Sequence, residues 1–285
     1  MTAAILDGVV LGLQFGILAV GFTLVYGLGG VLNLAYGQMA VVAGIVVSLA
    51  MDAGMPTATA IGLGLLAGGL FGLLLDTTLL RPVYRRRGEA RVLLSLLLTL
   101  GVAFTVDGLL IWRYPIQALS LHIGGDSVGI LGVPMRSGSM LASGIAIATF
   151  VVLYLFLRGT NLGRAVRSII QDEEGARLVG VDPDRMRTLI LILSGVLAGM
   201  VALTRSMTSP VTVTQGITFT IFALIVTVVG GLGSVLGAFL AGIILGIVNT
   251  VSSFYIGTFL TYIILLGAAA LTILLRPSGL LGTPE

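Results

Sequence analysis

Residues 163–187 read GRAVRSIIQDEEGARLVGVDPDRMR. This stretch holds ten of the 27 charged side chains of the whole chain, which has 15 basic and 12 acidic residues. Long apolar runs flank it on both sides. A short charged segment between two apolar runs is typical of a loop that joins two membrane-spanning helices.

The composition of the complete chain supports this interpretation. Of 285 residues, 57% are hydrophobic and only 9% are charged, and the mean hydropathy is +1.14. Soluble domains average about 25% charged residues. We therefore predict an all-α polytopic membrane protein, with residues 1–285 forming a single transmembrane domain. The longest polar stretches, 112–139 and 158–188, are too short for a core of their own.

A transmembrane helix needs about 20 apolar residues. By this criterion we expect eight or nine spans. The second is the least regular, because the polar and glycine-bearing stretch 33–38 precedes it; a broken helix there either spans the membrane or re-enters it. The candidate spans are 5–27, 34–51, 57–80, 92–112, 140–157, 189–206, 218–234, 237–255 and 258–275.

Arginine predicts the orientation. Loop 81–91 carries five arginines, segment 158–188 carries six, and Arg276 follows the last span, so 12 of the 15 basic residues lie on one side. Basic residues favour the cytoplasmic side. We therefore expect both loops to be cytoplasmic, with the N-terminus outside. The remaining arginines, on the outer side, are Arg113, Arg136 and Arg205.

Missing residue types exclude several kinds of chemistry. The chain has no cysteine and no lysine. A phosphate-binding Walker loop needs a lysine, so ATP hydrolysis would require another chain. His122 is the single histidine, and one histidine cannot make a metal site. We predict no metal site, no catalytic residues and no nucleic-acid partner.

Residues that favour helix starts and helix ends divide the charged segment. Thr160 or Asn161 can cap a short amphipathic helix that begins near Gly163, and Gly180 suits the position after its end. Asp182 suits the cap of the next helix, which has Pro183 in its first turn and continues into the span at 189. This pattern predicts a rigid element, 163–180, that faces the cytoplasm.

Glu174-Gly175-Ala176 followed by Gly180 resembles the EAA---G pattern of the coupling helix in ABC importer permeases. The chain as a whole resembles the branched-chain, or LIV-type, amino-acid permeases. The motifs that carry the resemblance are GFTLVYGLGGVLNLAYGQM (21–39), LGRAVRSIIQDEEGARLVGVD (162–182), VVGGLGSVLGAFLAGIILG (228–246) and RPSGLLG (276–282).

The resemblance implies a permease subunit of an ATP-driven ABC importer in the inner (cytoplasmic) membrane. It implies a homologous or identical second permease, two ATP-binding cassette subunits, an extracytoplasmic substrate-binding protein and contact with membrane lipid. ATP and Mg would bind the partner ATPase, and this chain would hold no cofactor. The ATPase-coupling residues would be Gly163, Arg164, Arg167, Asp172, Glu173, Glu174, Gly175, Ala176 and Gly180.

The implied substrate is a branched-chain or other hydrophobic amino acid. A urea or short-amide permease stays an alternative, and so does a transporter or channel that works without an ATPase. Tyr36 stands where the family often has histidine, and residues 113–139 match no motif of the family.

Uncharged polar residues at membrane depth either line a solute pathway or form hydrogen bonds between helices. The candidates are Gln14, Asn33, Tyr36, Gln38, Thr99 and Asn249. Asp76 and Asp107 lie near span ends, and we expect Asp76 to pair with Arg81. The sequences GLGGVL (27–32) and GLGSVL (231–236) also suggest a weak internal repeat.

Overall fold

The computed structural model describes residues 1–86, 88–121, 128–130, 133–276 and 279–281. Within them, eight helical segments are long and apolar enough to cross a membrane. They are α1 (Thr2–Gly29), the continuous stretch from α3 (Thr57–Leu75) through η1 (Asp76–Leu80) to α4 (Arg81–Tyr84), α5 (Glu89–Arg113), α6 (Ser137–Gly159), α9 (Pro183–Ser206), η2 (Val213–Gln215) with α10 (Gly216–Gly230), α11 (Val235–Ile256) and α12 (Thr258–Leu275).

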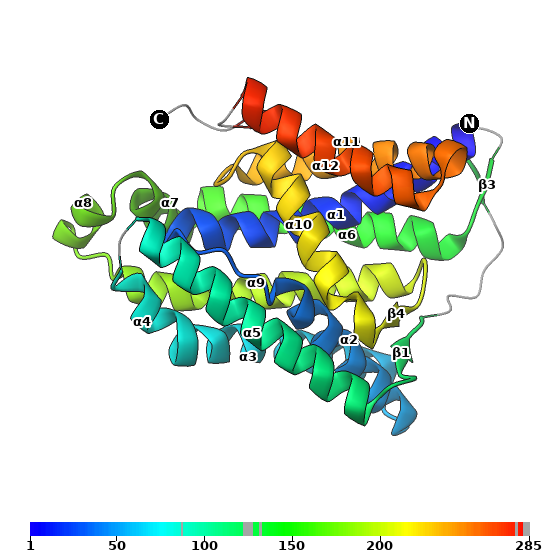
Figure 1. The fold of residues 1–285 in the computed structure, drawn as a ribbon. Helices are drawn as coiled ribbons and strands as arrows, with labels where there is room; N and C mark the ends of the chain where they lie inside the picture. Colours follow the sequence, from blue (N-terminus) through cyan, green and yellow to red (C-terminus); the bar gives the residue numbers. More distant parts are fainter. Residues whose placement is uncertain (87, 122–127, 131–132, 277–278, 282–285) are drawn as a thin grey trace.

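The predicted all-α membrane fold is thus confirmed, and each expected span has a helix. The second candidate is the shorter apolar helix α2 (Tyr36–Asp52). At about 1.5 Å per residue, its 17 residues extend over about 25 Å, less than the roughly 30 Å of a bilayer core. Figure 1 shows an extended stretch leading from the end of α1 into the middle of the bundle, where α2 begins. The segment is therefore a broken element.

The bundle has two ends that carry different elements (Figure 1). We call one the arginine-rich end; it carries α4 and the short helices α7 (Asn161–Gln171) and α8 (Glu173–Leu178). The opposite end carries the N-terminus and two small antiparallel pairings. One joins β1 (Ala118–Leu119) to β4 (Val211–Thr212), and the other joins β2 (Val128–Ile130) to β3 (Val133–Met135). We call it the N-terminal end.

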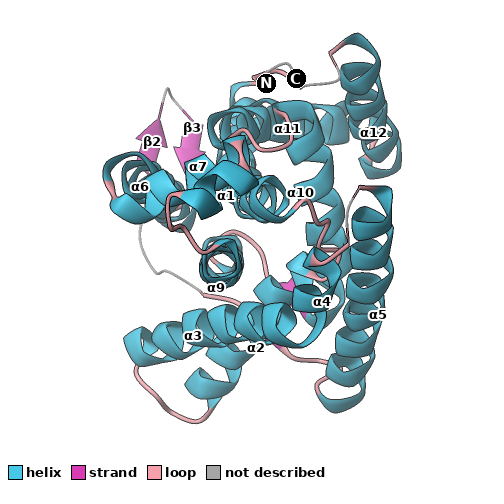
Figure 2. Cartoon of the chain, turned by 90° about the vertical axis from the view of Figure 1, so that its left-hand side faces the viewer, coloured by secondary structure: helices cyan, strands magenta, loops and turns pink. Residues whose placement is uncertain are grey.

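Helices α1 and α9 form the centre of the subunit. Figure 2, seen from the arginine-rich end, shows α9 end-on, with α1 on one side and α2 and α3 on the other. The most apolar window of α1 is 89% buried, whereas those of α5 and α12 are only 17% buried. The outer faces of α5 and α12 are therefore available to lipid or to a partner chain.

Small residues allow α1 and α11 to pack at very short range. A Cβ added at Gly246 would lie 2.2 Å from the Cα of Gly12, and one added at Gly242 would lie 2.4 Å from the Cα of Gly16. Close backbone approach at small residues is a main source of helix association in lipid. The glycine-rich run 237–246 therefore serves helix packing.

Candidate functional site

Local capping builds the charged segment. The Thr160 hydroxyl accepts a hydrogen bond from the Gly163 N–H at 3.0 Å and caps α7. The Asp182 carboxylate accepts from the Asp184 and Arg185 N–H groups, at 3.0 and 3.3 Å, and caps α9. These bonds satisfy amides that have no partner within the helix. Both helix starts agree with the sequence-based expectation.

The segment differs from the prediction in having two helices in place of one. The backbone of Asp172 is extended, which ends α7, and its carboxylate accepts from the Glu174 N–H at 3.0 Å to cap α8. A Cβ added at Gly175 would lie 2.5 Å from that carboxylate. Gly175 therefore makes room for the cap.

Helix α8 ends in a C-terminal cap formed at Gly180. Gly180 has φ +87°, its N–H bonds to the Arg177 carbonyl at 3.1 Å, and the Val181 N–H bonds to the Ala176 carbonyl at 3.0 Å. This pair of bonds is the Schellman arrangement, which reverses the chain after a helix. The two residues just before the turn are left in solvent: Leu178 is 89% exposed and Val179 is 77% exposed.

Ala176 lies on the other side of α8. It is buried within the chain, so it packs against other parts of the same chain. The small residue of the EGA---G pattern therefore holds α8 against its own subunit. Leu178 and Val179, which sequence reasoning missed, are the apolar side chains that α8 presents outward.

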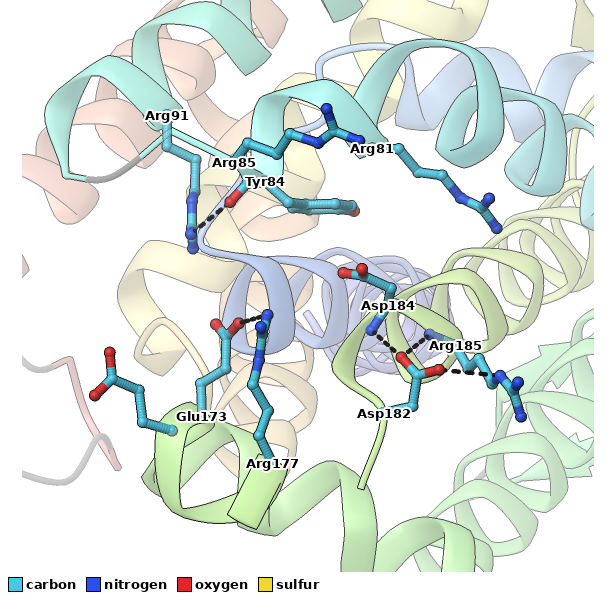
Figure 3. A pocket seen from close by; sticks show the side chains of 10 residues that line it. Arg81, Tyr84, Arg85, Arg91, Glu173, Arg177, Asp182, Asp184 and Arg185 are labelled. Atoms are coloured by element: carbon cyan, nitrogen blue, oxygen red, sulfur yellow. Dashed lines mark hydrogen bonds and ion pairs between the residues drawn. The ribbon is translucent and has the colours of Figure 1, made fainter. Parts of the chain in front are cut away.

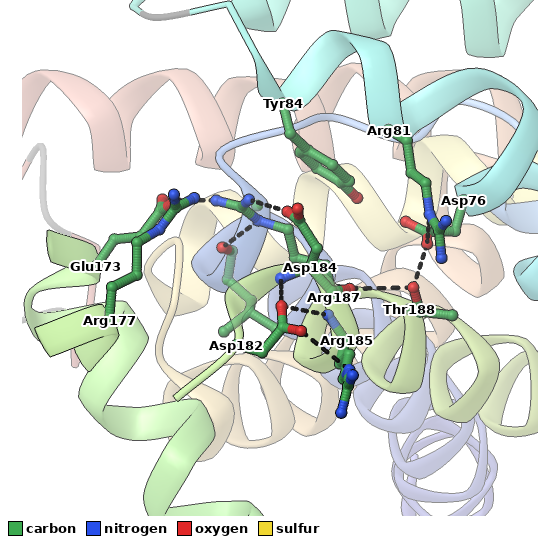
Figure 4. A network of polar contacts seen from close by, with 12 residues as sticks. Asp76, Arg81, Tyr84, Glu173, Arg177, Asp182, Asp184, Arg185, Arg187 and Thr188 are labelled. Carbon is green, nitrogen blue, oxygen red and sulfur yellow. Dashed lines mark hydrogen bonds and ion pairs between the residues drawn. The ribbon is translucent and has the colours of Figure 1, made fainter. Parts of the chain in front are cut away.

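A buried arginine ties α8 to the membrane helices (Figure 4). Arg187, only 2% exposed, pairs with Glu173 of α8 at 2.5 Å and with Asp184 at 3.1 Å. Its guanidinium lies 4.5 Å from the centre of the Tyr84 ring and donates to the Leu28 carbonyl at 3.5 Å. We call these five residues the Arg187 cluster. It joins α8, α9, α4 and the end of α1.

Arg91 makes a second connection to the end of α1. Its guanidinium donates to the Gly29 carbonyl at 3.2 Å, to the Tyr84 carbonyl at 2.9 Å and to the Arg86 carbonyl at 2.8 Å. Cations stabilise the carbonyl end of a helix, which carries partial negative charge. Loop 81–91 therefore has a structural role in addition to its predicted topological one.

A polar crevice separates loop 81–91 from α8 and the start of α9 (Figure 3). Its volume is about 750 Å³. Side chains of both charges line it, among them Arg81, Arg85, Glu174, Asp182 and Arg185.

Asp76 lies beside this crevice, inside the π-helical turn η1. Its carboxylate accepts a hydrogen bond from the Thr188 hydroxyl and lies 3.7 Å from the Arg81 guanidinium. The expected pairing of Asp76 with Arg81 is thereby confirmed. The bond to Thr188 adds a further link between the α3–α4 segment and α9 (Figure 4).

Inside the bundle, three hydroxyls support the broken segment 30–35. Ser95 accepts from the Leu32 N–H at 3.2 Å, and Thr99 accepts from the Leu34 N–H at 2.9 Å. Thr220 accepts from the Gly37 N–H at 2.9 Å and donates to the Leu34 carbonyl at 3.1 Å. Unpaired backbone groups are costly in a bilayer, so these side chains make the break possible. We call this arrangement the helix-break junction.

Four of the predicted pathway residues meet at this junction, and all are buried. The Asn33 side chain accepts from the Ala35 N–H at 3.0 Å, and Gln38 donates to Asp107 at 3.3 Å. Tyr36 packs edge-on against Phe22, 5.9 Å between ring centres. Thr99 accepts a hydrogen bond from the Leu34 N–H. Contact with a solute stays a prediction for all four.

The other two predicted pathway residues lie elsewhere. Gln14 and Asn249 line cavities at the N-terminal end of the bundle. Gln14 donates to the Thr204 carbonyl at 3.2 Å. His122 lies outside the described residues.

Several residues of these sites were not singled out from the sequence. Two of them lie close to features that were: Arg187 is five residues after Asp182, and Leu178 is two residues before Gly180. Ser95 and Thr220 gave no signal, because single hydroxyls are common in membrane helices and often bond within their own helix. Their partners are 63 and 186 residues away in the chain.

Comparison with known proteins identifies the family. Residues 4–275 match the family model described as "Branched-chain amino acid transport system / permease component". The high-affinity branched-chain amino acid permease LivH of Escherichia coli is 28% identical over 205 residues, covering 68% of this chain and 67% of LivH. BraD of Pseudomonas aeruginosa is 26% identical, covering 99% of this chain and 95% of BraD.

A solved structure shares the fold. PsaBC from Streptococcus pneumoniae, in complex with Fab, superposes with a TM-score of 0.50 at 12% identity, covering 95% of this chain and 91% of the other. At that identity the likeness concerns the fold alone. The family model covers nearly the whole chain, and the membrane fold agrees with it. This multi-pass inner-membrane protein therefore belongs to the branched-chain amino acid permease family.

Proposed function

We propose that the chain is the translocating subunit of an ATP-driven importer for branched-chain or other hydrophobic amino acids. It would pair with a second permease, either homologous or identical, and bind two separate ATPase subunits that hold ATP and Mg. An extracytoplasmic binding protein would deliver the substrate. Family membership supports this assignment, and the arginine distribution supports a cytoplasmic position for the arginine-rich end.

The observation that carries the proposal is the exposed apolar tip of α8. Leu178 and Val179 lie in solvent at the end of a helix whose other face is buried. The two neighbouring aliphatic side chains protrude from a segment that is otherwise rich in charge, so they are available for an apolar contact with another protein. We assign this tip to a groove on the ATPase subunit.

The Arg187 cluster supplies a route from that contact to the spans. A displacement of α8 moves Glu173, which is bound to Arg187, and Arg187 also contacts Tyr84 and the last turn of α1. Helix α1 packs along α11 and α9 through the centre of the subunit. Movement of the ATPase subunits would therefore reach the helices that enclose the pathway.

The test replaces the tip with charge in the reconstituted transporter. Leu178→Asp with Val179→Asp should abolish leucine uptake and reduce co-purification of the ATPase by at least about tenfold, because burying two carboxylates at an apolar contact costs several kcal/mol. Membrane abundance should stay normal, since both side chains are exposed. Leu178→Ile with Val179→Ile, which keeps apolar side chains at both exposed positions, is the matched control. Normal uptake and co-purification in the double variant would contradict the proposal.

A further inference from the structure

Two cavities at the N-terminal end of the bundle meet at one arginine. The first, of about 430 Å³, lies between the outer turns of α1, the start of α6 and the end of α9. The second, of about 380 Å³, lies against α10 and the start of α12. Arg205 lines both. Volumes in this range accommodate small organic molecules.

Arg205 lies in the last turn of α9. Its guanidinium donates a hydrogen bond to the Thr208 hydroxyl at 3.4 Å. In the described part of the chain, no acidic group lies within ion-pair distance of it. Arg187, at the other end of the same helix, has two carboxylates. A partly buried guanidinium without an anion is suited to binding one, often through two parallel hydrogen bonds.

Acceptor groups line the first cavity together with Arg205. Gln14 is 1% exposed; its amide nitrogen bonds to the Thr204 carbonyl, and its amide oxygen has no hydrogen-bond partner. The carboxylate of Asp7 lines the same cavity. A buried amide oxygen without a protein partner is unfavourable unless water or a ligand supplies a donor. An ammonium group is such a donor, and Asp7 supplies the opposite charge.

The rest of the lining is suited to an aliphatic side chain. Val10, Leu11 and Met135 contribute apolar surface to the first cavity, beside the charged groups. Arg136 also lines it and adds a second cation. The cavity thus combines a carboxylate binder, ammonium acceptors and an apolar surface within one small volume.

We propose that Arg205 binds the carboxylate of a zwitterionic aliphatic amino acid at an entry site on the N-terminal end of the permease. Gln14 and Asp7 would receive the ammonium group, and Val10, Leu11 and Met135 would contact the side chain. The inference rests on the proposed function, because it places an amino-acid substrate on this subunit.

The experiment measures ligand binding by saturation-transfer NMR, with the full chain in nanodiscs of zwitterionic lipid. Three probes separate the groups: leucine, 4-methylpentanoate, which lacks the ammonium, and leucinamide, which lacks the carboxylate. Arg205→Gln should reduce the affinity for leucine and 4-methylpentanoate by at least about tenfold, the loss expected for a charge-assisted hydrogen bond. Leucinamide should bind weakly to both proteins.

Two further variants control the result. Arg205→Lys keeps the charge without the paired donors, so its affinity for leucine should lie between those of the wild type and Arg205→Gln. Arg113→Gln, on the same end of the bundle, lines neither cavity and stacks on Tyr114 at 4.9 Å, so it should bind leucine normally. If Arg205→Gln lowers the melting temperature, the wild-type preference for 4-methylpentanoate over leucinamide decides the question, and equal binding of the two overturns the inference.

Uptake by the reconstituted transporter distinguishes a failure of the entry site from a failure of the proposed function. Leucine uptake by the wild type, together with unchanged leucine binding in Arg205→Gln, would overturn the role of Arg205 and leave the proposed function standing. Unchanged binding is also the result expected if Arg205 holds a lipid headgroup. If the wild-type transporter moves no leucine, the proposed function fails and the entry site fails with it.

Discussion

The breaks between helices at the arginine-rich end and the break inside the bundle are stabilised differently. At the arginine-rich end, Asp172 and Asp182 cap the next helix through bonds two or three residues away. At the helix-break junction, Ser95, Thr99 and Thr220 reach the broken backbone from other helices. Water can satisfy a loose amide at a membrane surface but not inside the bilayer. An interior break therefore needs side chains from the surrounding fold.

The largest expected effect tests whether the two ends face different compartments. The chain has no native cysteine, so single cysteines can be labelled in intact cells with an impermeant maleimide. Ile116→Cys, at a position 94% exposed on the N-terminal end, should be labelled, and Gly159→Cys at the arginine-rich end should not. Labelling of Gly159→Cys only after the cells are opened is the control. The reverse pattern would invert the topology.

The next prediction concerns close packing at the helix-break junction. A Cβ at Gly37 would lie 1.9 Å from the Gly216 carbonyl oxygen. Gly37→Val should therefore destabilise the protein by about 3 kcal/mol or more, because the backbone of two helices must move. The measurement is the melting temperature of the purified chain in detergent. Gly62→Val, where a Cβ meets open space, should melt like the wild type.

A smaller effect is expected from removing one hydroxyl. Thr220→Val leaves the Gly37 N–H and the Leu34 carbonyl without their partner, at a cost of about 1–3 kcal/mol. Thr105→Val is the matched control, because Thr105 lies on an exposed face and bonds only within its own helix. Equal melting temperatures for the two variants would show that the junction does not depend on Thr220.

The smallest effect is expected at the arginine-rich end. Asp172→Ala removes the cap of α8 and should weaken that helix by about 0.5–2 kcal/mol without changing the melting of the bundle. Proteolytic cleavage of segment 172–181 should become faster, while Asp172→Asn, which keeps a capping oxygen, should behave like the wild type. A global fall in melting temperature as large as that of Thr220→Val would remove the contrast between the two kinds of break.

The sequence by itself determined the membrane class, the positions of the spans and the segment beginning at Thr160. These follow from apolar run length and from caps that lie within a few residues of the amides they serve. The start of α9 at Asp182 and the turn at Gly180 follow in the same way. Such signals are local, so the linear chain contains all of their parts.

Only the tertiary structure decided the rest. The division of 163–180 into two helices depends on the extended backbone of Asp172. The hydrogen bond from Arg187 to the Leu28 carbonyl joins residues that are 159 positions apart in the chain. The non-helical backbone of segment 30–35 lies inside the bundle because hydroxyls from α5 and α10 bond to it. In a bilayer every interior backbone group needs a partner within the protein, and at a break that partner comes from whichever helix the fold brings alongside.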